Sequence, residues 1–220
     1  IQVCIREYRC RRYQNVQGEL MGHTLLGTTT ISSNVASVAI NGIIDDTYDL
    51  YEIHITNVRF TTLGSSLMIE FSDSSTDYNL TMTNTAYYSA HYKTGSWYAI
   101  TGTGGWAANS THNTSTADNA QDNLGARLTD AIGAYDHSTQ QYNSHNGIIR
   151  LYDPSNTTFH KKFEAEFESG NYQIGAFYVK TAGSINTTSA VEKVRFSNNV
   201  HTEYTSPLMQ AGIFRLYGVT

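Results

Sequence analysis

The sequence predicts an all-β protein: an antiparallel β-sandwich, jelly-roll-like, with an extended N-terminal arm. The 220 residues include 16 Tyr but only 2 Pro, and Thr and Tyr favour strands whereas the abundant Asn, Ser and Gly favour turns. Short runs of alternating apolar and polar residues recur from residue 22 onward, separated by turn clusters. No internal repeat with a period of about 20–50 residues is present, which disfavours a propeller or a solenoid.

The first 21 residues differ from the rest of the chain. The opening stretch IQVCIREYRCRRY is rich in arginine, and a hinge-like QNVQGELMG follows it. The arginines are Arg6, Arg9, Arg11 and Arg12. We therefore predict a basic arm and hinge over residues 1–21 and one β-sandwich domain over residues 22–220.

The charge of the arm bears on its partner. A short basic run is often only a solvated terminus, but it also suits docking on an acidic surface. The whole chain is acidic, with 14 Lys and Arg against 19 Asp and Glu, and it lacks an aromatic RNA-binding pattern. A protein partner is therefore favoured over nucleic acid. Cys4 and Cys10 would lie about 20 Å apart in an extended arm, so a disulfide would need a turn and two separate thiols are favoured.

The first half of the domain contains five predicted strands. They lie in HTLLGTTTI, SVAING, LYEIHITNVRF, SLMIEFS and YNLTMT. SVAING carries the apolar residues Val38 and Ile40. Alternation places on one face of their strands Tyr51, Ile53, Ile55, Leu67, Ile69 and Phe71, and on the opposite face Glu52, His54, Thr56, Met68 and Glu70. At Asn57 the alternation shifts onto Val58 and Phe60, which predicts a β-bulge.

Five further strands are predicted in GIIRLYDP, TFHKKFEAEFE, YQIGAFYVK, AVEKVRF and GIFRLYGV. The expected core residues are Phe159, Phe163, Ala165, Phe167, Phe214 and Leu216. The expected outward residues are Glu164, Glu166, Ile213, Arg215 and Tyr217. We expect Gly212 and Gly218 to allow close approach of neighbouring groups.

The region between these two halves gives weaker signals. Residues 101–122 have almost no apolar content apart from Trp106 and predict a long loop. The stretch ADNAQDNLGARLTDAI is predicted as loop and strand around Leu124, Ala126 and Leu128, because Asn and Gly weaken a helix there.

Candidates for catalysis or metal binding are weak. The chain has no GxSxG, no HExxH and no phosphate-binding glycine loop with its lysine. His137 beside Asp136 is the nearest approach to a dyad, but it sits in a polar, solvated segment. DSSTD, from Asp73 to Asp77, could offer oxygens to calcium, but a plain hairpin turn is favoured. We expect no catalytic residue, no metal and no cofactor. No run approaches about 18 apolar residues, so no membrane span is expected.

An aromatic cluster precedes the long loop, in AYYSAHYKTGSWYAI. Flat aromatic faces beside Asn, Ser and His donors can stack on sugar rings, although Tyr is also common in cores and subunit interfaces. Structural use is favoured, and glycan contact is the alternative. The residues that would make that contact are Tyr88, His91, Tyr92, Trp97 and Trp106.

Five ordered segments resemble one widespread group of bacteriophage virion proteins. The segments are LLGTTTISSNVASVAINGI, DTYDLYEIHITNV, GIIRLYDPSNTTFHKKFEAEF, NTTSAVEKVRFS and AGIFRLYGVT. The resemblance covers about residues 22–220 and excludes the arm. It implies a jelly-roll-like domain on the particle exterior, as capsid decoration or as a tail fibre, and association as a homotrimer around a three-fold axis. It implies no catalytic residue.

Together these observations predict a non-enzymatic virion structural protein on the outside of the particle. We expect it to decorate or cement the capsid, docking on other virion proteins through the arginines of its arm. The alternative is a tail-fibre module that recognises a host surface glycan through the aromatic cluster.

Overall fold

A computed structural model describes residues 22–41, 44–61, 65–73, 77–91, 100–103, 125–129, 144–171, 175–200 and 208–220. These residues form strands and no helix. The strands are β1 (His23–Ile31), β2 (Ser37–Asn41), β3 (Leu50–Phe60), β4 (Ser65–Ser72), β5 (Met82–His91), β6 (Ile100–Thr103), β7 (Ala126–Arg127), β8 (His145–Tyr152), β9 (Lys161–Asn171), β10 (Gly175–Ile185), β11 (Lys193–Val200) and β12 (Met209–Val219). The predicted arm, residues 1–21 with Arg6, Arg9, Arg11 and Arg12, lies outside the described residues, as do Cys4 and Cys10.

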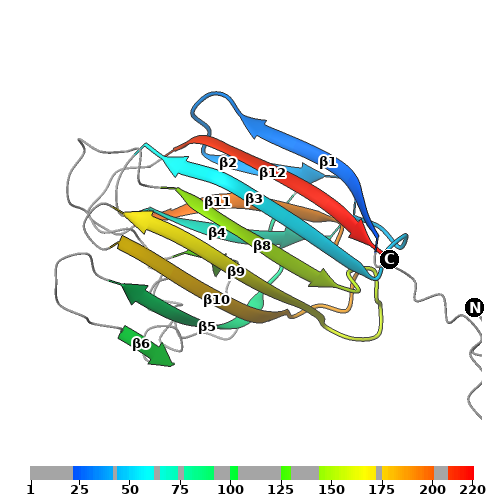
Figure 1. Ribbon diagram of the computed structural model, residues 1–220. Helices are drawn as coiled ribbons and strands as arrows, with labels where there is room; N and C mark the ends of the chain where they lie inside the picture. Colours follow the sequence, from blue (N-terminus) through cyan, green and yellow to red (C-terminus); the bar gives the residue numbers. More distant parts are fainter. Residues whose placement is uncertain are drawn as a thin grey trace, which may run out of the picture.

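The strands form two antiparallel sheets. The larger has eight strands in the order β1-β12-β3-β8-β9-β10-β5-β6, and the smaller has four in the order β2-β11-β4-β7. Figure 1 shows the large sheet in front of the small one. Because both sheets are antiparallel and face each other, the predicted all-β sandwich is confirmed. The finer jelly-roll description stays a prediction.

One apolar core lies between the sheets. Phe71 of β4 packs on Phe163 of β9, with ring centroids 5.5 Å apart, and Phe196 of β11 packs on Phe214 of β12 at 4.9 Å. Each pair joins one sheet to the other, at the centroid spacing that aromatic rings prefer. The apolar faces predicted from alternation in β3, β4 and β12 are buried here, together with Val38 and Ile40 of β2.

The two C-terminal glycines are placed as predicted. A Cβ added at Gly218 would come within 2.4 Å of the Tyr48 ring, and one at Gly212 within 2.8 Å of the Val58 side chain. No real side chain tolerates such distances. The absence of a side chain at these positions lets the terminal strand β12 lie close to its neighbours.

One core prediction is wrong. Phe159 is 70% exposed, whereas Phe163 and Phe167 are buried. The backbone N–H groups of Thr158 and Phe159 both donate to Oδ1 of Asn156, at 2.7 and 2.9 Å. This turn holds Phe159 outside the sheet, so the alternation of β9 begins only at Lys161.

Residues 74–76 of DSSTD lie outside the described residues, so the predicted hairpin turn there stays a prediction. After it, the N–H of Leu80 donates back to the carbonyl of Phe71 at 3.3 Å, and the next strand, β5, belongs to the other sheet. Residues 101–103, predicted as the start of the long loop, belong instead to β6 (Ile100–Thr103), which pairs with β5, and residues 104–122 lie outside the described residues.

Among the described residues, no helix is long and apolar enough to cross a membrane.

Candidate functional site: the outer face of the large sheet

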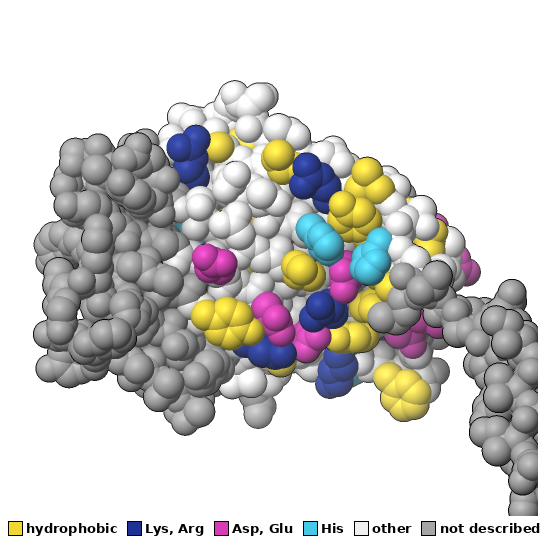
Figure 2. Space-filling model, in the orientation of Figure 1, with side chains coloured by type: hydrophobic (Ala, Val, Ile, Leu, Met, Phe, Trp, Pro, Cys, Tyr) yellow, Lys and Arg dark blue, Asp and Glu magenta, His cyan; other side chains and the backbone are white. Residues whose placement is uncertain are grey.

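A row of polar side chains crosses the outer face of the large sheet over six neighbouring strands. Taken in the order of the strands across the sheet, it consists of His23 on β1, Tyr217 on β12, Glu52 and His54 on β3, Arg150 and Tyr152 on β8, Glu164 and Glu166 on β9, and Lys180 on β10. We call this set the ionic row. Figure 2 shows acidic, basic and histidine side chains gathered in the middle of this face.

Strand register explains why these side chains meet. Glu52 lies opposite Tyr217 on one side and opposite Arg150 on the other. Arg150 lies opposite Glu164, and Glu166 lies opposite Lys180. Directly opposite residues in antiparallel strands project from the same face, so charges of opposite sign become neighbours across the sheet.

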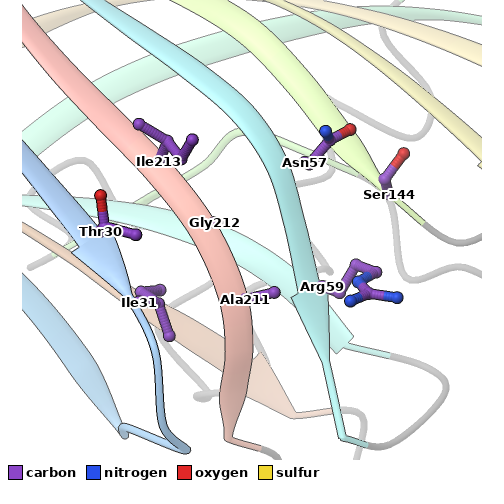
Figure 3. A pocket seen from close by; sticks show the side chains of 8 residues that line it. All are labelled: Thr30, Ile31, Asn57, Arg59, Ser144, Ala211, Gly212 and Ile213. Atoms are coloured by element: carbon purple, nitrogen blue, oxygen red, sulfur yellow. The ribbon is translucent and has the colours of Figure 1, made fainter.

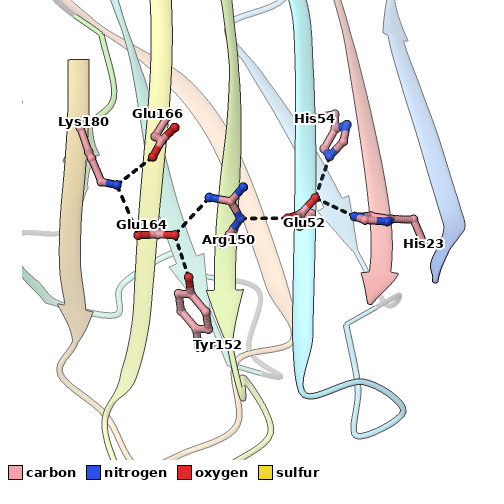
Figure 4. Close-up of polar contacts among 8 residues, drawn as sticks. All are labelled: His23, Glu52, His54, Arg150, Tyr152, Glu164, Glu166 and Lys180. Carbon is pink, nitrogen blue, oxygen red and sulfur yellow. Dashed lines mark hydrogen bonds and ion pairs between the residues drawn. The ribbon is translucent and has the colours of Figure 1, made fainter. Parts of the chain in front are cut away.

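Glu52 is the centre of the ionic row. Although it faces outward, it is only 8% exposed, because its partners cover it. Its Oε1 accepts a hydrogen bond from Nε of Arg150 at 2.9 Å, and its Oε2 lies 2.9 Å from Nε2 of His54 and 3.1 Å from Nε2 of His23 (Figure 4). A carboxylate oxygen selects the tautomer in which each of these imidazole nitrogens carries hydrogen. Glu52 thus links β1, β3 and β8.

The row continues from Arg150 toward β10. Oε1 of Glu164 accepts from Nη1 of Arg150 at 3.1 Å and from the hydroxyl of Tyr152 at 2.8 Å. Nζ of Lys180 lies 2.7 Å from Oε1 of Glu166 and 3.8 Å from Oε2 of Glu164. The prediction that Glu164 and Glu166 face outward is confirmed, but they are paired rather than merely solvated.

These contacts fix the protonation states of the acids. Burial raises the pKa of Glu52, but hydrogen bonds from His54, Arg150 and His23 outweigh it and hold the pKa below its ordinary value. Hydrogen bonds from Tyr152 and Arg150 likewise lower the pKa of Glu164, and those to Glu52 and Glu164 raise the pKa of Arg150. A carboxyl group with a lowered pKa is ionised at neutral pH and is poorly suited to act as a general acid.

The histidines pack on an aromatic ring. The centroid of the His54 ring lies 4.7 Å from that of Tyr217, and the centroid of the His23 ring lies 6.1 Å from it in an edge-on arrangement. No group of three or more His, Cys, Asp or Glu within the described ranges is arranged to hold a metal ion. Arg150, bonded to the same carboxylate, adds a positive charge that would oppose one. The ionic row therefore has a structural role: it links neighbouring strands across the sheet.

A hollow lies on the same sheet, toward the C-terminal end of β3. It is open to solvent and has a volume of about 430 Å³. Its lining consists of Thr30 and Ile31 of β1, Asn57 and Arg59 of β3, Ser144 before β8, and Ala211, Gly212 and Ile213 of β12 (Figure 3). We call it the bulge hollow.

Two neighbouring irregularities produce the bulge hollow. The β3–β8 pairing skips from Ile55 to Val58, and the β3–β12 pairing is irregular around Ala211. Asn57 has a φ of +53° and Gly212 a φ of +153°; Asn and Gly are the residues that tolerate such values. The N–H of Asn57 donates to Oδ1 of Asn146 at 2.9 Å instead of to a strand carbonyl. The bulge predicted at Asn57 is confirmed, and it interrupts the flat face of the sheet.

The polar groups of the bulge hollow are unlike those of the ionic row. Within the part of the chain that the structure describes, the side chains of Thr30, Arg59 and Ser144 have no hydrogen-bond or ion-pair partner. Arg215, two residues beyond Ile213 on the same strand, is likewise unpaired among the described residues. Asn57 uses only its backbone N–H. These hydrogen-bonding side chains therefore line one hollow without satisfying one another.

The aromatic set predicted to contact glycan is only partly placed. Tyr88 and His91 lie on β5, where the structure describes their backbone alone. Tyr92, Trp97 and Trp106 lie outside the described residues, as do Asp136 and His137. Glycan contact by this cluster stays a prediction.

Sequence reasoning missed both the ionic row and the bulge hollow. The available signal was the polar face of three strands: Glu52 and His54 in one, Arg150 and Tyr152 in the next, Glu164 and Glu166 in the third. Strand alternation predicted the outward direction of the two pairs in β3 and β9, but not that of Arg150 and Tyr152, and only the strand order makes all six neighbours. Arg59 gave no signal beyond its place after the bulge.

Comparison of the chain with protein-family models, with curated proteins and with solved structures finds no match.

Proposed function

We propose that this protein is a non-enzymatic structural protein of the exterior of a bacteriophage particle, with capsid decoration or cementing as its role. The observation that carries the proposal is the position of the five segments that resemble virion proteins. They cover most of β1, β12, β3, β8 and β9, which are consecutive in the large sheet, and β2 and most of β11, which are adjacent in the small one. The resemblance therefore falls on one continuous framework rather than on scattered strands.

The chemistry of the sheet face supports a structural role. The acids and bases of the ionic row are bound to one another, and the pKa values of Glu52 and Glu164 are lowered. Such groups rigidify a sheet and are poorly available for proton transfer. Charged residues are only 15% of the chain, so much of the polar surface is uncharged hydroxyl and amide.

The proposed partners are other virion proteins and two further copies of this chain. Leu25 of the edge strand β1 is 53% exposed and Phe159 is 70% exposed, which gives apolar contacts for neighbours. Arg6, Arg9, Arg11 and Arg12 would dock the arm on an acidic surface. Analytical ultracentrifugation of the full chain tests the homotrimer, and a monomer at all concentrations would refute it.

The direct test is the amount of this chain in purified particles. Quantitative mass spectrometry of gradient-purified virus should find hundreds of copies per particle, and antibody should label intact capsids. A few tens of copies on the tail would contradict capsid decoration, and absence from particles would refute the proposal. Deletion of residues 1–13 should abolish particle binding, and binding should weaken with salt if the arginines act electrostatically.

A tail module that recognises a host surface glycan is the second candidate. The bulge hollow favours it, because unpaired donors beside apolar side chains are typical of sugar sites. A glycan array with the wild type and Trp106→Ala tests whether the aromatic cluster takes part. Identical array profiles for both proteins would exclude that cluster from the recognition.

A further inference from the structure

We propose that the bulge hollow binds an anionic sugar, a saccharide unit that carries a carboxylate, with Arg59 as the carboxylate ligand. This binding site is separate from the structural role above and does not depend on it. The argument rests on the charge of the hollow, its remaining lining groups, its size and the way the backbone builds it.

Charge gives the class of ligand. Arg59 lines the hollow and has no acidic partner among the described residues. Arg215 lies on the outward face of β12, two residues from the lining residue Ile213 and about 7 Å along the strand. On the same sheet face, Glu52, Glu164 and Glu166 are paired with Arg150, Lys180 and the histidines of the ionic row, whereas Glu168 is exposed on β9 opposite Asn146. Arg59 therefore brings to the lining of the hollow a positive charge that no described acid pairs with.

The shape of the Arg59 guanidinium favours a carboxylate as the anionic group of the ligand. Its planar fork of N–H donors matches the two oxygens of a carboxylate, and this bidentate pairing is stronger and more directional than a point charge. Because Arg59 has no internal partner to lose, a ligand would not have to break an existing ion pair.

The other lining groups fit the rest of a sugar. Thr30 and Ser144 supply hydroxyls and Asn57 supplies an amide, which can donate to and accept from sugar hydroxyls. Ile213 and Ala211 supply apolar surface for the C–H face of a ring. A volume of about 430 Å³ lies within the usual range of small-ligand pockets.

The backbone is irregular at the bulge hollow. Bulges often lie next to functional sites, where they redirect side chains, and strained φ values also concentrate there. Here β3 holds an extra residue around Asn57, opposite Gly212, and β12 holds another between Met209 and Ala211. Two neighbouring strands therefore depart from regular pairing beside the hollow.

The test uses the full chain and trigalacturonic acid, with maltotriose as the neutral trisaccharide control. We expect titration followed by amide NMR to shift the signals of Thr30, Asn57, Gly212 and Ile213 at concentrations of about 10 mM, ten times the Kd of a millimolar site. Maltotriose should shift them at least tenfold less effectively. Arg59→Gln should weaken binding about tenfold or more, because it removes a charged hydrogen bond. The affinity of Arg59→Lys should lie between those of the wild type and Arg59→Gln.

Lys162→Gln is the matched control, since it removes an exposed cation from the same sheet away from the hollow, and it should bind as the wild type does. The proposal is overturned if those amides do not shift, if Arg59→Gln binds with unchanged affinity, or if maltotriose binds equally well. It is also overturned if inorganic phosphate matches trigalacturonic acid in affinity and in dependence on Arg59, because the site would then bind any anion.

Discussion

The ionic row and the bulge hollow occupy the same sheet face and share the same kinds of residue, yet they are organised in opposite ways. In the ionic row, regular pairing sets Glu52 opposite Arg150, and each charge meets its counterpart. In the bulge hollow, irregular pairing leaves Arg59 without one among the described residues. On this sheet, strand register therefore decides whether a polar side chain meets an internal partner and stabilises the fold, or stays unpaired and available to a ligand.

The largest expected effect is the loss of the central carboxylate. Glu52→Gln should lower the free energy of unfolding by about 2–3 kcal/mol, because Arg150 and two histidines lose a buried charged acceptor. Urea unfolding measures this value. Glu168→Gln, an exposed acid on β9, is the matched control and should change stability by less than about 0.5 kcal/mol. Equal losses in both variants would contradict the central place of Glu52.

The pH dependence of stability should follow from the same group. Because folding lowers the pKa of Glu52, its carboxylate contributes stability that is complete above the unfolded value of 4.5 and is lost as the pH falls through the folded value. The difference in stability between wild type and Glu52→Gln should therefore be constant just above that pH and shrink below it. Urea titrations over a pH series check this. A stability difference that grows as the pH falls would contradict a lowered pKa of Glu52 in the folded state.

The bulge hollow should depend on glycine at position 212. Gly212→Ala should cost about 1–2 kcal/mol, because the new Cβ would lie 2.8 Å from Cγ2 of Val58 and the φ of +153° disfavours a side chain. Asn57→Gly is the contrasting variant: glycine adopts a φ of +53° without strain, so we expect stability within about 1 kcal/mol of wild type. If Gly212→Ala were neutral in urea unfolding, the backbone there would be less constrained than the structure shows.

The smallest expected effect is the loss of the unpaired arginine. Arg59→Gln should leave the free energy of unfolding within about 0.5 kcal/mol of wild type. Arg195 is the paired counterpart, because its Nε and Nη2 lie 2.8 and 2.9 Å from the two oxygens of Glu70. Arg195→Gln should therefore lower stability by about 1–2 kcal/mol. Equal losses of stability in the two variants would mean that ion pairing does not determine how much each arginine contributes to stability.

The sequence predicted local features well, because alternation is a local property. The core faces of β3, β4 and β12 and the bulge at Asn57 follow from the order of apolar and polar residues. Phe159 was misplaced because the turn at Asn156 ends one alternation before β9 begins another. Buried Lys161 then occupies the inward position where β9 starts, with Nζ 3.3 Å from the carbonyl of Thr187.

The candidate sites could not be predicted in the same way. Glu52 meets His23 and Arg150 across separations of 29 and 98 residues, and such contacts exist only once the strand order is known. The bulge hollow needs two irregularities in register, and only the one at Asn57 left a mark in the alternation of the sequence.

Urea unfolding with and without trigalacturonic acid tests the central claim most directly, because a ligand that binds the native state raises its stability. Without ligand, Arg59→Gln should unfold at the wild-type midpoint and Glu52→Gln at a lower one. With ligand, the midpoints of wild type and Glu52→Gln should rise, and that of Arg59→Gln should rise much less. The claim is contradicted if Arg59→Gln is destabilised without ligand as much as Glu52→Gln, or if ligand raises its midpoint as much as that of the wild type.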